Sequence, residues 1–479
     1  MSLKKKALSG IVWTFAQQFG SQAITFLVSI VLARLLLPSE FGIIGMITVF
    51  ISIGSSLANS GMTQSLIRTE NPDQEDFSTV FFFNLTISTV IYAIIFAGAP
   101  FVADFYNQPI LKNVLRVYSL SFIIQAFSTV QLTRLTKLME FKTQMIVALP
   151  SLIGSGIVGI VMGYKGFGVW ALVWMNLVQV FLSTVQLWWY SGWFPSLVFS
   201  KAKFREHFGF GFKLTLSGLL NTVFANIYQI VIGKFFSPAQ VGFYTRAVAL
   251  KQLPVSNISS TLNKVSYPLF ASIQNDDVRL RRVYKQLMQI VTFLLAPLLL
   301  LMGVLGEPLF RLLFTEKWLP AVPYFQVVCL NGILYPIHSY NLNILKVKGR
   351  SDLFLRLEVV KRIITIGILS VTIPLGIIPM LWGQVLSSVL AFGVNTFYSG
   401  KFINYTAWQQ SRDLLPTLTL GFAAALATFA LDKFYFQGFS DFMRLFLGFC
   451  IGGVMYLLTN YLFKTESMNH FYSLIIKRK

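Results

Sequence analysis

Long apolar runs recur along the whole chain and constrain its fold more than any other feature. The run "LLAPLLLLMGVLG" at 294–306 contains no charged residue. A helix crosses the ~30 Å hydrocarbon layer of a membrane with roughly 20 residues, whereas a membrane-spanning β-strand needs about ten residues of alternating polarity. Because these runs do not alternate, we expect an all-α integral membrane protein.

Composition agrees with this expectation. Apolar residues make up 55% of the 479 residues, charged residues only 12%, and the mean hydropathy is +0.66. The opening "LKKKALSGIVWTF" is typical of a signal peptide, but its apolar stretch continues to about Leu37 without a small-residue cleavage site. A signal peptide has an apolar region of only about 7–15 residues. We therefore interpret the opening as an uncleaved first span.

Thirteen stretches are apolar and long enough to be predicted as spans, while 240–268 is too polar to be predicted by hydropathy alone. The thirteen are 10–37, 40–66, 78–99, 112–135, 143–163, 167–190, 211–236, 283–305, 319–345, 357–378, 380–400, 414–432 and 442–463.

An internal repeat assigns the remaining stretch. "ARLLLPSEFG" at 33–42 returns as "GKFFSPAQVG" at 233–242. Since a span follows the first copy, 240–268 is predicted as a fourteenth span. Six spans per repeat give two lobes of the same orientation, as in transporters with parallel repeats. We expect six-helix lobes at about 1–195 and 205–403, an extra helix pair at 414–463, and a basic tail at 464–479.

The distribution of cations sets the predicted topology. With fourteen spans and a cytoplasmic N-terminus, most Lys and Arg residues fall on the inner side, as the positive-inside rule requires. Both termini are then cytoplasmic. The formal net charge of +21 is explained by topology and by contact with anionic lipids, without nucleic acid as a partner.

The repeated motif itself predicts a tight turn between two helices. Pro38 and Pro238 suit a first helical turn, and Gly42 and Gly242 permit close helix approach. For the cations of the motif, two interpretations stay open, because a long cationic side chain can reach headgroups or face a cavity. These cations are Arg34 and Lys234.

The polar stretch 240–268 carries the strongest signal for a binding site. It contains Arg246, Lys251 and Lys264 but no carboxylate. A cation inside a span costs several kcal/mol unless it meets water, a partner or a ligand. Arg246 and Lys264 lie near the ends and could reach headgroups, whereas Lys251 is deeper. Together they suit an anionic cargo such as a phosphate.

Uncharged polar residues on neighbouring spans give a second set of candidates. They would bind hydroxyl-rich groups or, equally, form hydrogen bonds between helices. The candidates are Gln18, Gln22, Asn226, Gln229 and Asn257.

Other chemistry is not indicated. Cys329 and Cys450 lie in apolar runs, which argues against a disulfide, and the three histidines are scattered without metal-ligand spacing. There is no nucleotide-binding motif, so we expect no cofactor and no direct use of ATP. Ion coupling lacks an evident buried acid, with Glu40 and Glu358 as the remaining candidates.

Several blocks, in their order and spacing, resemble a known family. The blocks are "SLIRTENPDQEDFSTVFFFNL" (65–85), "LRVYSLSFIIQAFSTV" (115–130), "GFGVWALV" (166–173) and the stretch 243–284 that begins "FYTRAVALKQLPVSNISS". They are similar to bacterial polysaccharide exporters, the Wzx-type O-antigen and colanic-acid-like flippases of the multidrug/oligosaccharidyl-lipid/polysaccharide superfamily.

The resemblance implies fourteen helices in two lobes in the bacterial inner membrane. It also implies transport of an undecaprenyl-diphosphate-linked oligosaccharide for surface polysaccharide or lipopolysaccharide synthesis, with polymerase machinery as a further partner. Family cations that hold the cargo carry over to Arg34, Arg246 and Lys251, and less directly to Lys234 and Lys264. The second span lacks an interior cation, which departs from the family.

Three alternatives remain. A multidrug-type antiporter of the same superfamily would need acids buried in the early spans, and none is evident there. A membrane-embedded polysaccharide polymerase or ligase would need reactive groups on large outer loops, but the predicted outer loops are short. A lipid II flippase would use similar cations, although the blocks match the polysaccharide branch better. We therefore expect a transporter rather than an enzyme.

Overall fold

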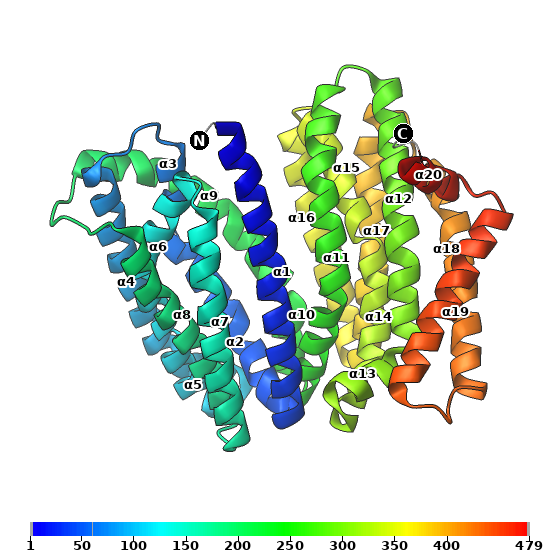
Figure 1. The fold of residues 1–479 in the computed structure, drawn as a ribbon, viewed down its shortest axis with the longest axis horizontal. Coiled ribbons are helices and arrows are strands. Elements are labelled where there is room, and N and C mark those ends of the chain that lie inside the picture. Colours follow the sequence, from blue (N-terminus) through cyan, green and yellow to red (C-terminus); the bar gives the residue numbers. More distant parts are fainter. Residues whose placement is uncertain (1–2, 60, 477–479) are drawn as a thin grey trace. The chain divides into compact units, whose positions relative to one another are not determined.

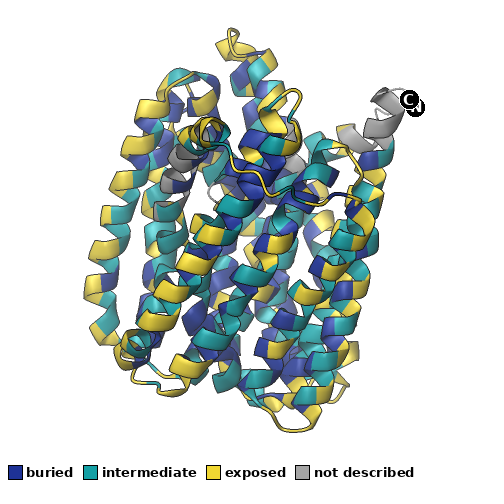
Figure 2. Cartoon of the chain, turned by 90° about the vertical axis from the view of Figure 1, so that its left-hand side faces the viewer, coloured by how far each residue is buried: buried dark blue, intermediate teal, exposed yellow. Residues whose placement is uncertain are grey.

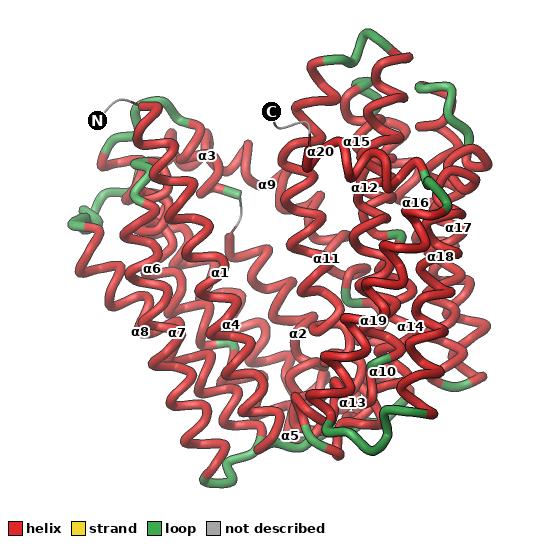
Figure 3. Tube along the Cα trace, turned by 45° about the vertical axis from the view of Figure 1, so that its right-hand side comes forward, coloured by secondary structure: helices red, strands yellow, loops and turns green. Residues whose placement is uncertain are grey.

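The computed structural model describes residues 3–59 and 61–476, and over these residues it consists of helices joined by loops and turns, with no β-strand (Figure 3). Side chains of a few helical residues, among them 261–265, lie outside the description. The prediction of an all-α fold is confirmed. The chain forms two compact units, Met1–Gly242 (unit 1) and Phe243–Lys479 (unit 2).

Unit 1 is built on a row of long helices. α7 packs against α1 and α8, α8 against α6, and α6 against α4 (Figure 1). The helices of unit 1 are α1 (Leu3–Leu35), α2 (Pro38–Asn59), α3 (Met62–Arg68), α4 (Gln74–Tyr106), α5 (Ile110–Tyr118), α6 (Leu120–Lys137), α7 (Phe141–Tyr164), α8 (Val169–Ser191), α9 (Lys201–Ala225) and α10 (Ile227–Phe235), followed by the start of α11 (Pro238–Ser272).

Unit 2 contains the rest of α11 and a second group of packed helices. α12 packs against α14 and α18, α17 against α15 and α16, and α18 against α19. The elements that follow α11 are α12 (Asp277–Val304), α13 (Gly306–Phe314), η1 (Glu316–Ala321), α14 (Val322–Ile333), α15 (Tyr335–Val347), α16 (Ser351–Thr372), η2 (Ile373–Leu375), α17 (Ile377–Phe402), α18 (Ala407–Phe434), α19 (Asp441–Leu462) and α20 (Glu466–Ile476).

Helices occupy every predicted span, and some predicted spans are divided between two helices. Within residues 3–59 and 61–476, ten helical stretches are long and apolar enough to cross a membrane. The predicted spans that fail this criterion are 211–236, 240–268, 319–345 and 357–378, because they carry charged or polar residues or are interrupted by a helix break. The number fourteen therefore stays a prediction.

The long helices expose many large apolar side chains, and Figure 2 shows how exposed positions run along the helices. Phe101 on α4 is 76% exposed and Trp189 on α8 is 84% exposed. Apolar surface on this scale is not left in contact with water in soluble proteins. The apolar faces of these helices are accordingly the lipid-contacting surface of a multi-pass membrane protein.

The two copies of the repeated motif meet within unit 1. A Cβ added to Gly42 would lie 1.7 Å from the carbonyl oxygen of Pro238, and one added to Gly242 would lie 1.9 Å from that of Pro38. Any larger residue would overlap backbone atoms. The expectation that these glycines permit a close helix approach is therefore confirmed. Each glycine lies against the backbone of the proline in the other copy of the motif.

The N-terminal part of α9 is anchored to α4 through a buried carboxylate. Asp76, 1% exposed, forms an ion pair with Lys203 at 3.0 Å. His207 Nε2 donates to Asp76 Oδ1 at 3.1 Å, and Ser65 Oγ on α3 lies 2.9 Å from His207 Nδ1. These contacts join α3, α4 and α9 into one buried polar cluster.

Candidate functional site

A polar pocket of about 240 Å³ lies within unit 2, between α11, the break separating α14 from α15, α16 and α17. We call it the basic pocket. Its lining contains three side chains that are cationic at neutral pH and one carboxylate. The lining residues are Lys251, Asn331, Tyr335, His338, Glu358, Lys361, Arg362, Thr365, Gln384, Ser387, Ser388 and Ala391.

Lys251 enters the basic pocket from the middle of α11 and is only 8% exposed. Its stem passes Gly332 on α14, where an added Cβ would lie 2.9 Å from Lys251 Cδ. The absence of a side chain at Gly332 thus leaves the space that the aliphatic part of Lys251 occupies. Among the described residues no carboxylate forms an ion pair with Lys251, although such a buried charge is costly unless an anion or water meets it.

The other charges of the basic pocket come from one face of α16. Glu358, Lys361 and Arg362 stand at positions i, i+3 and i+4, which share a helix face. Glu358 pairs with Lys361 and, through Oε2 at 3.0 Å, with Arg362. One carboxylate therefore serves two cations, and the pocket keeps an excess of positive charge.

His338 contributes a neutral polar wall. Its Nδ1 lies 3.3 Å from the amide nitrogen of Asn395, and its Nε2 lies 2.9 Å from Ser388 Oγ. An amide NH₂ can only donate, so Nδ1 accepts and Nε2 carries the proton that it donates to Ser388. Both ring nitrogens are thus committed to the protein.

The cations predicted from the sequence are not all brought together. Of the predicted set, Lys251 is the one that lines the basic pocket. Arg246 is half-buried on α11 outside that lining, and Arg34 is exposed near the end of α1. The Lys264 side chain lies outside the described residues.

Lys234 has a local role in unit 1. Its Nζ donates to the carbonyl oxygen of Phe105 at 2.7 Å and lies 4.7 Å from the centre of the Phe105 ring. These contacts fasten the end of α10 to the end of α4. They favour the structural interpretation of the repeated cation at this position.

The predicted polar candidates are spread over several helices. Gln18 is exposed on α1, and Gln22 and Asn257 are half-buried. Asn226, at the break between α9 and α10, donates to the carbonyl oxygen of Thr222 at 2.8 Å. The Oε1 atom of Gln229 is buried and accepts no hydrogen bond from a described residue.

Lys361 and Arg362 were not predicted as pocket residues, because their charges also fit the positive-inside rule for a cytoplasmic loop. The spacing "EVVKR" at 358–362 was the available signal. Glu40, a coupling candidate, instead caps α2, where its Oε2 accepts from the backbone N–H of Leu37 at 2.6 Å. Of the acidic residues whose burial the structure describes, Asp76 and Asp432 are buried, and both are ion-paired.

Comparisons with known proteins agree with this architecture. The family profile described as polysaccharide biosynthesis protein matches residues 31–323. The chain is thus a multi-pass helical membrane protein, and it belongs to the polysaccharide biosynthesis protein family.

Two relatives align over most of their length. The succinoglycan biosynthesis transport protein ExoT of Rhizobium meliloti (strain 1021) is 24% identical over 94% of this chain and 92% of its own. The teichuronic acid biosynthesis protein TuaB of Bacillus subtilis (strain 168) is 25% identical over 95% of both chains. The fold is similar to the solved lipid II flippase MurJ in its inward closed conformation, with a TM-score of 0.74 and 13% identity over 95% of this chain and 98% of that one.

Proposed function

We propose that this protein is a flippase that moves a polyprenyl-diphosphate-linked oligosaccharide across the bacterial inner membrane for surface polysaccharide synthesis. The basic pocket carries this proposal, because the buried Lys251, together with Lys361 and Arg362, gives it an excess of positive charge that an anionic partner would offset. A diphosphate matches guanidinium and ammonium donors. A relative named as a succinoglycan biosynthesis transport protein, and a fold similar to that of a lipid II flippase, support the same function.

The proposed mechanism uses the charges of the basic pocket in turn. Without cargo, Glu358 neutralises part of the charge of Lys361 and Arg362. An arriving diphosphate binds the unpaired Lys251 and competes with Glu358 for the other two cations. Glu358 then helps release, because it can take back both cations when the cargo leaves.

Transport then follows alternating access between two lobes, for which we propose residues 1–195 and 205–403, with 414–463 as an accessory helix pair. The polyprenyl tail stays in the lipid while the head group crosses. In this arrangement both termini are cytoplasmic, and polymerase machinery receives the cargo on the other side. The chain acts as a transporter and carries out no covalent step.

A cation-exporting antiporter fits the pocket less well. Such a protein would need a carboxylate free to bind a cationic substrate, whereas Glu358 already faces two cations. Adding a cationic drug would increase an existing excess of positive charge. The charge of the basic pocket therefore favours an anionic cargo.

Thermal stabilisation of the purified protein in detergent tests this proposal. Undecaprenyl-diphosphate oligosaccharide is compared with a cationic dye, using wild type and Lys251→Met. We expect the lipid-linked sugar alone to raise the melting temperature, and the variant to lose most of that rise. Stabilisation by the dye alone would overturn the proposal in favour of the antiporter.

A further inference from the structure

A second polar hollow, of about 510 Å³, lies within unit 1 between α3, α6 and α8, and we call it the amide–hydroxyl pocket. None of its lining residues is charged. The lining consists of Thr63, Gln64, Ile67, Gln125, Ser128, Thr129, Leu132, Thr133, Thr136, Gln179, Val180, Ser183 and Leu187. Its volume is within the ~300–1,000 Å³ range of small-molecule sites.

Two threonine hydroxyls of this pocket donate hydrogen bonds to backbone carbonyl oxygens of their own helix, and their oxygen atoms can still accept hydrogen bonds from a ligand. Thr129 Oγ1 donates to the carbonyl oxygen of Gln125 at 2.9 Å, and Thr133 Oγ1 donates to that of Thr129 at 2.7 Å. A hydroxyl that donates still has oxygen lone pairs that can accept. Each threonine hydroxyl thus has its own hydrogen bonded to the helix backbone, and its oxygen can accept a hydrogen bond from a ligand.

The amides of this pocket are uncommitted. Among the described residues, no hydrogen bond reaches the side-chain amide of Gln64, Gln125 or Gln179. Each amide offers two donors and one acceptor oxygen. The pocket thus offers both hydrogen-bond donors and hydrogen-bond acceptors to a ligand, and its lining carries no charge.

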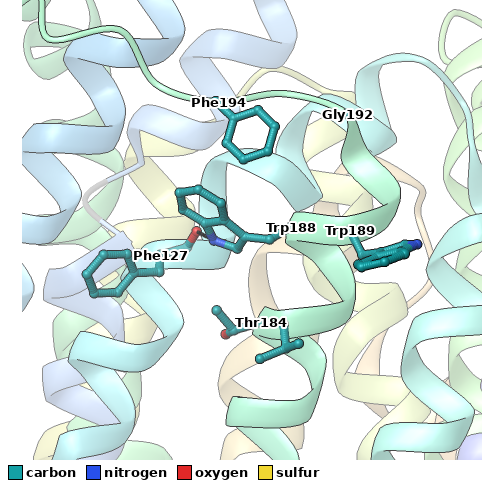
Figure 4. Close-up of a pocket in the computed structure, with 7 residues that line it drawn as sticks. Phe127, Thr184, Trp188, Trp189, Gly192 and Phe194 are labelled. Atoms are coloured by element: carbon teal, nitrogen blue, oxygen red, sulfur yellow. Dashed lines mark hydrogen bonds between the residues drawn. The ribbon is translucent and has the colours of Figure 1, made fainter.

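On α6 and α8, the residues that line the amide–hydroxyl pocket lie on a different side from a group of aromatic and apolar residues. Neighbouring positions on α6 and α8 line a different, aromatic hollow that contains Phe127, Thr184, Trp188 and Phe194 (Figure 4). Ser128 and Ser183, adjacent to Phe127 and Thr184 in sequence, line the amide–hydroxyl pocket instead. Because unpaired polar groups are costly in lipid, the segregation indicates a pocket that receives a polar occupant.

We propose that the amide–hydroxyl pocket binds the neutral sugar residues of the lipid-linked cargo. Sugar hydroxyls both donate and accept hydrogen bonds, which matches the glutamine amides and threonine oxygens of this pocket in kind. A diphosphate finds no cation there and is not bound by it. This inference rests on the proposed function, and it adds a glycan-selecting site separate from the basic pocket.

Binding of two charge-matched probes tests the proposal. The first is farnesyl diphosphate linked to di-N-acetylchitobiose, and the second is the methyl ester of farnesyl diphosphate, which has the same charge but no sugar. Binding is measured by calorimetry on the full chain in lauryldimethylamine oxide, because detergents with sugar head groups would compete. Wild type is expected to bind the glycosylated probe about tenfold more tightly than the methyl ester.

The decisive variant is Gln125→Leu with Gln179→Leu, which keeps side-chain volume and removes both amides. We expect the sugar-dependent gain to fall below about threefold while affinity for the methyl ester stays unchanged. Thr129→Val provides a milder second variant if the double variant folds poorly. Gln326→Leu, at an exposed position of unit 2, is the matched control and should keep the full gain.

The outcomes separate the two proposals. Equal affinity of wild type for both probes, or an undiminished gain in the folded variants, overturns the glycan site and leaves the flippase standing. Binding of neither probe to wild type overturns the proposed function and the glycan site with it.

Discussion

The proposed binding site depends most on one residue, Lys251. Its charge is buried, its path depends on the absence of a side chain at Gly332, and no described carboxylate pairs with it. Nearby, Glu358 faces two cations. The unpaired lysine and the carboxylate shared by two cations leave the basic pocket with an excess of positive charge, which suits the anion that we propose it binds.

Removing the carboxylate should strengthen anion binding. In Glu358→Gln, Lys361 and Arg362 lose the carboxylate that competes with an anionic ligand for them. The affinity for the methyl ester of farnesyl diphosphate should therefore rise about three- to tenfold. Calorimetry at low ionic strength measures this change. Asp352→Asn is the matched control, because Asp352 is an exposed carboxylate of the same helix paired with Arg350. Weaker binding by Glu358→Gln would contradict the role of the carboxylate.

At this scale, sequence reasoning found part of the site. Lys251 stood out because it interrupts a predicted span. Lys361 and Arg362 did not, because hydropathy cannot separate a charged helix face that lines a pocket from a charged helix end at the membrane surface. Gln125 and Gln179 were missed because amides in spans commonly bond between helices, and only packing shows which face is hollow.

At the scale of helices, the repeated turn is a packing device. Gly42→Ala would place a Cβ against the backbone of Pro238 and should lower stability by about 1–3 kcal/mol or more. The melting temperature in detergent measures the effect. Gly98→Ala on α4 is the control, because nothing lies within 4 Å of its added Cβ, and helix propensity should make that change neutral or stabilising. Equal melting temperatures for the two variants would contradict the close contact.

The anchoring of α9 depends on Asp76. Asp76→Asn removes the carboxylate charge that contacts Lys203 and His207, and we expect the free energy of unfolding to fall by about 1–3 kcal/mol. Hydrogen exchange should then increase locally over residues 192–209. Glu70→Gln, an exposed change in the preceding turn, should leave exchange there unaltered. Unchanged exchange in Asp76→Asn would show that the anchor is elsewhere.

The docking of α20 should weaken in acid. Burial raises the pKa of the Glu466 carboxyl, but hydrogen bonds from Lys285 and Gln289 and the charge of Lys285 outweigh it, so the pKa lies below its ordinary value of 4.5. Lys285 also pairs with Asp413 at 3.1 Å. A carboxyl with a lowered folded pKa stabilises above its unfolded pKa, and this stability is lost as pH falls through the folded pKa.

Limited proteolysis of α20 between pH 7 and pH 3 measures this effect. Cleavage should be slow at neutral pH and rise as the pH falls below about 4.5, the ordinary pKa of the carboxyl, and on through its lower folded pKa. Glu466→Gln should be cleaved at the acid rate throughout. A wild-type rate that does not change with pH would contradict the role of Glu466.

The helices themselves were largely predictable from sequence, because long apolar runs and the 33–42/233–242 repeat fix where spans begin and turn. The stretch 240–268 was assigned by the repeat, and a single helix, α11, occupies it. The break at Asn226 was not predicted, because no proline or glycine marks it. The break at Leu334 was missed although Pro336, which has no backbone N–H to continue the helix, lies two residues beyond it.

For the molecule as a whole, we propose that the cations of the basic pocket hold a lipid-linked anion while it crosses the membrane. Flipping of a fluorescent polyprenyl-diphosphate oligosaccharide in proteoliposomes tests it most directly, with dithionite bleaching the outer leaflet. Lys251→Met is compared with Lys165→Met, an exposed lysine after α7. We predict that wild type and Lys165→Met flip the probe and that Lys251→Met is at least about tenfold slower. Equal flipping by Lys251→Met and Lys165→Met, or none by wild type, would contradict the account.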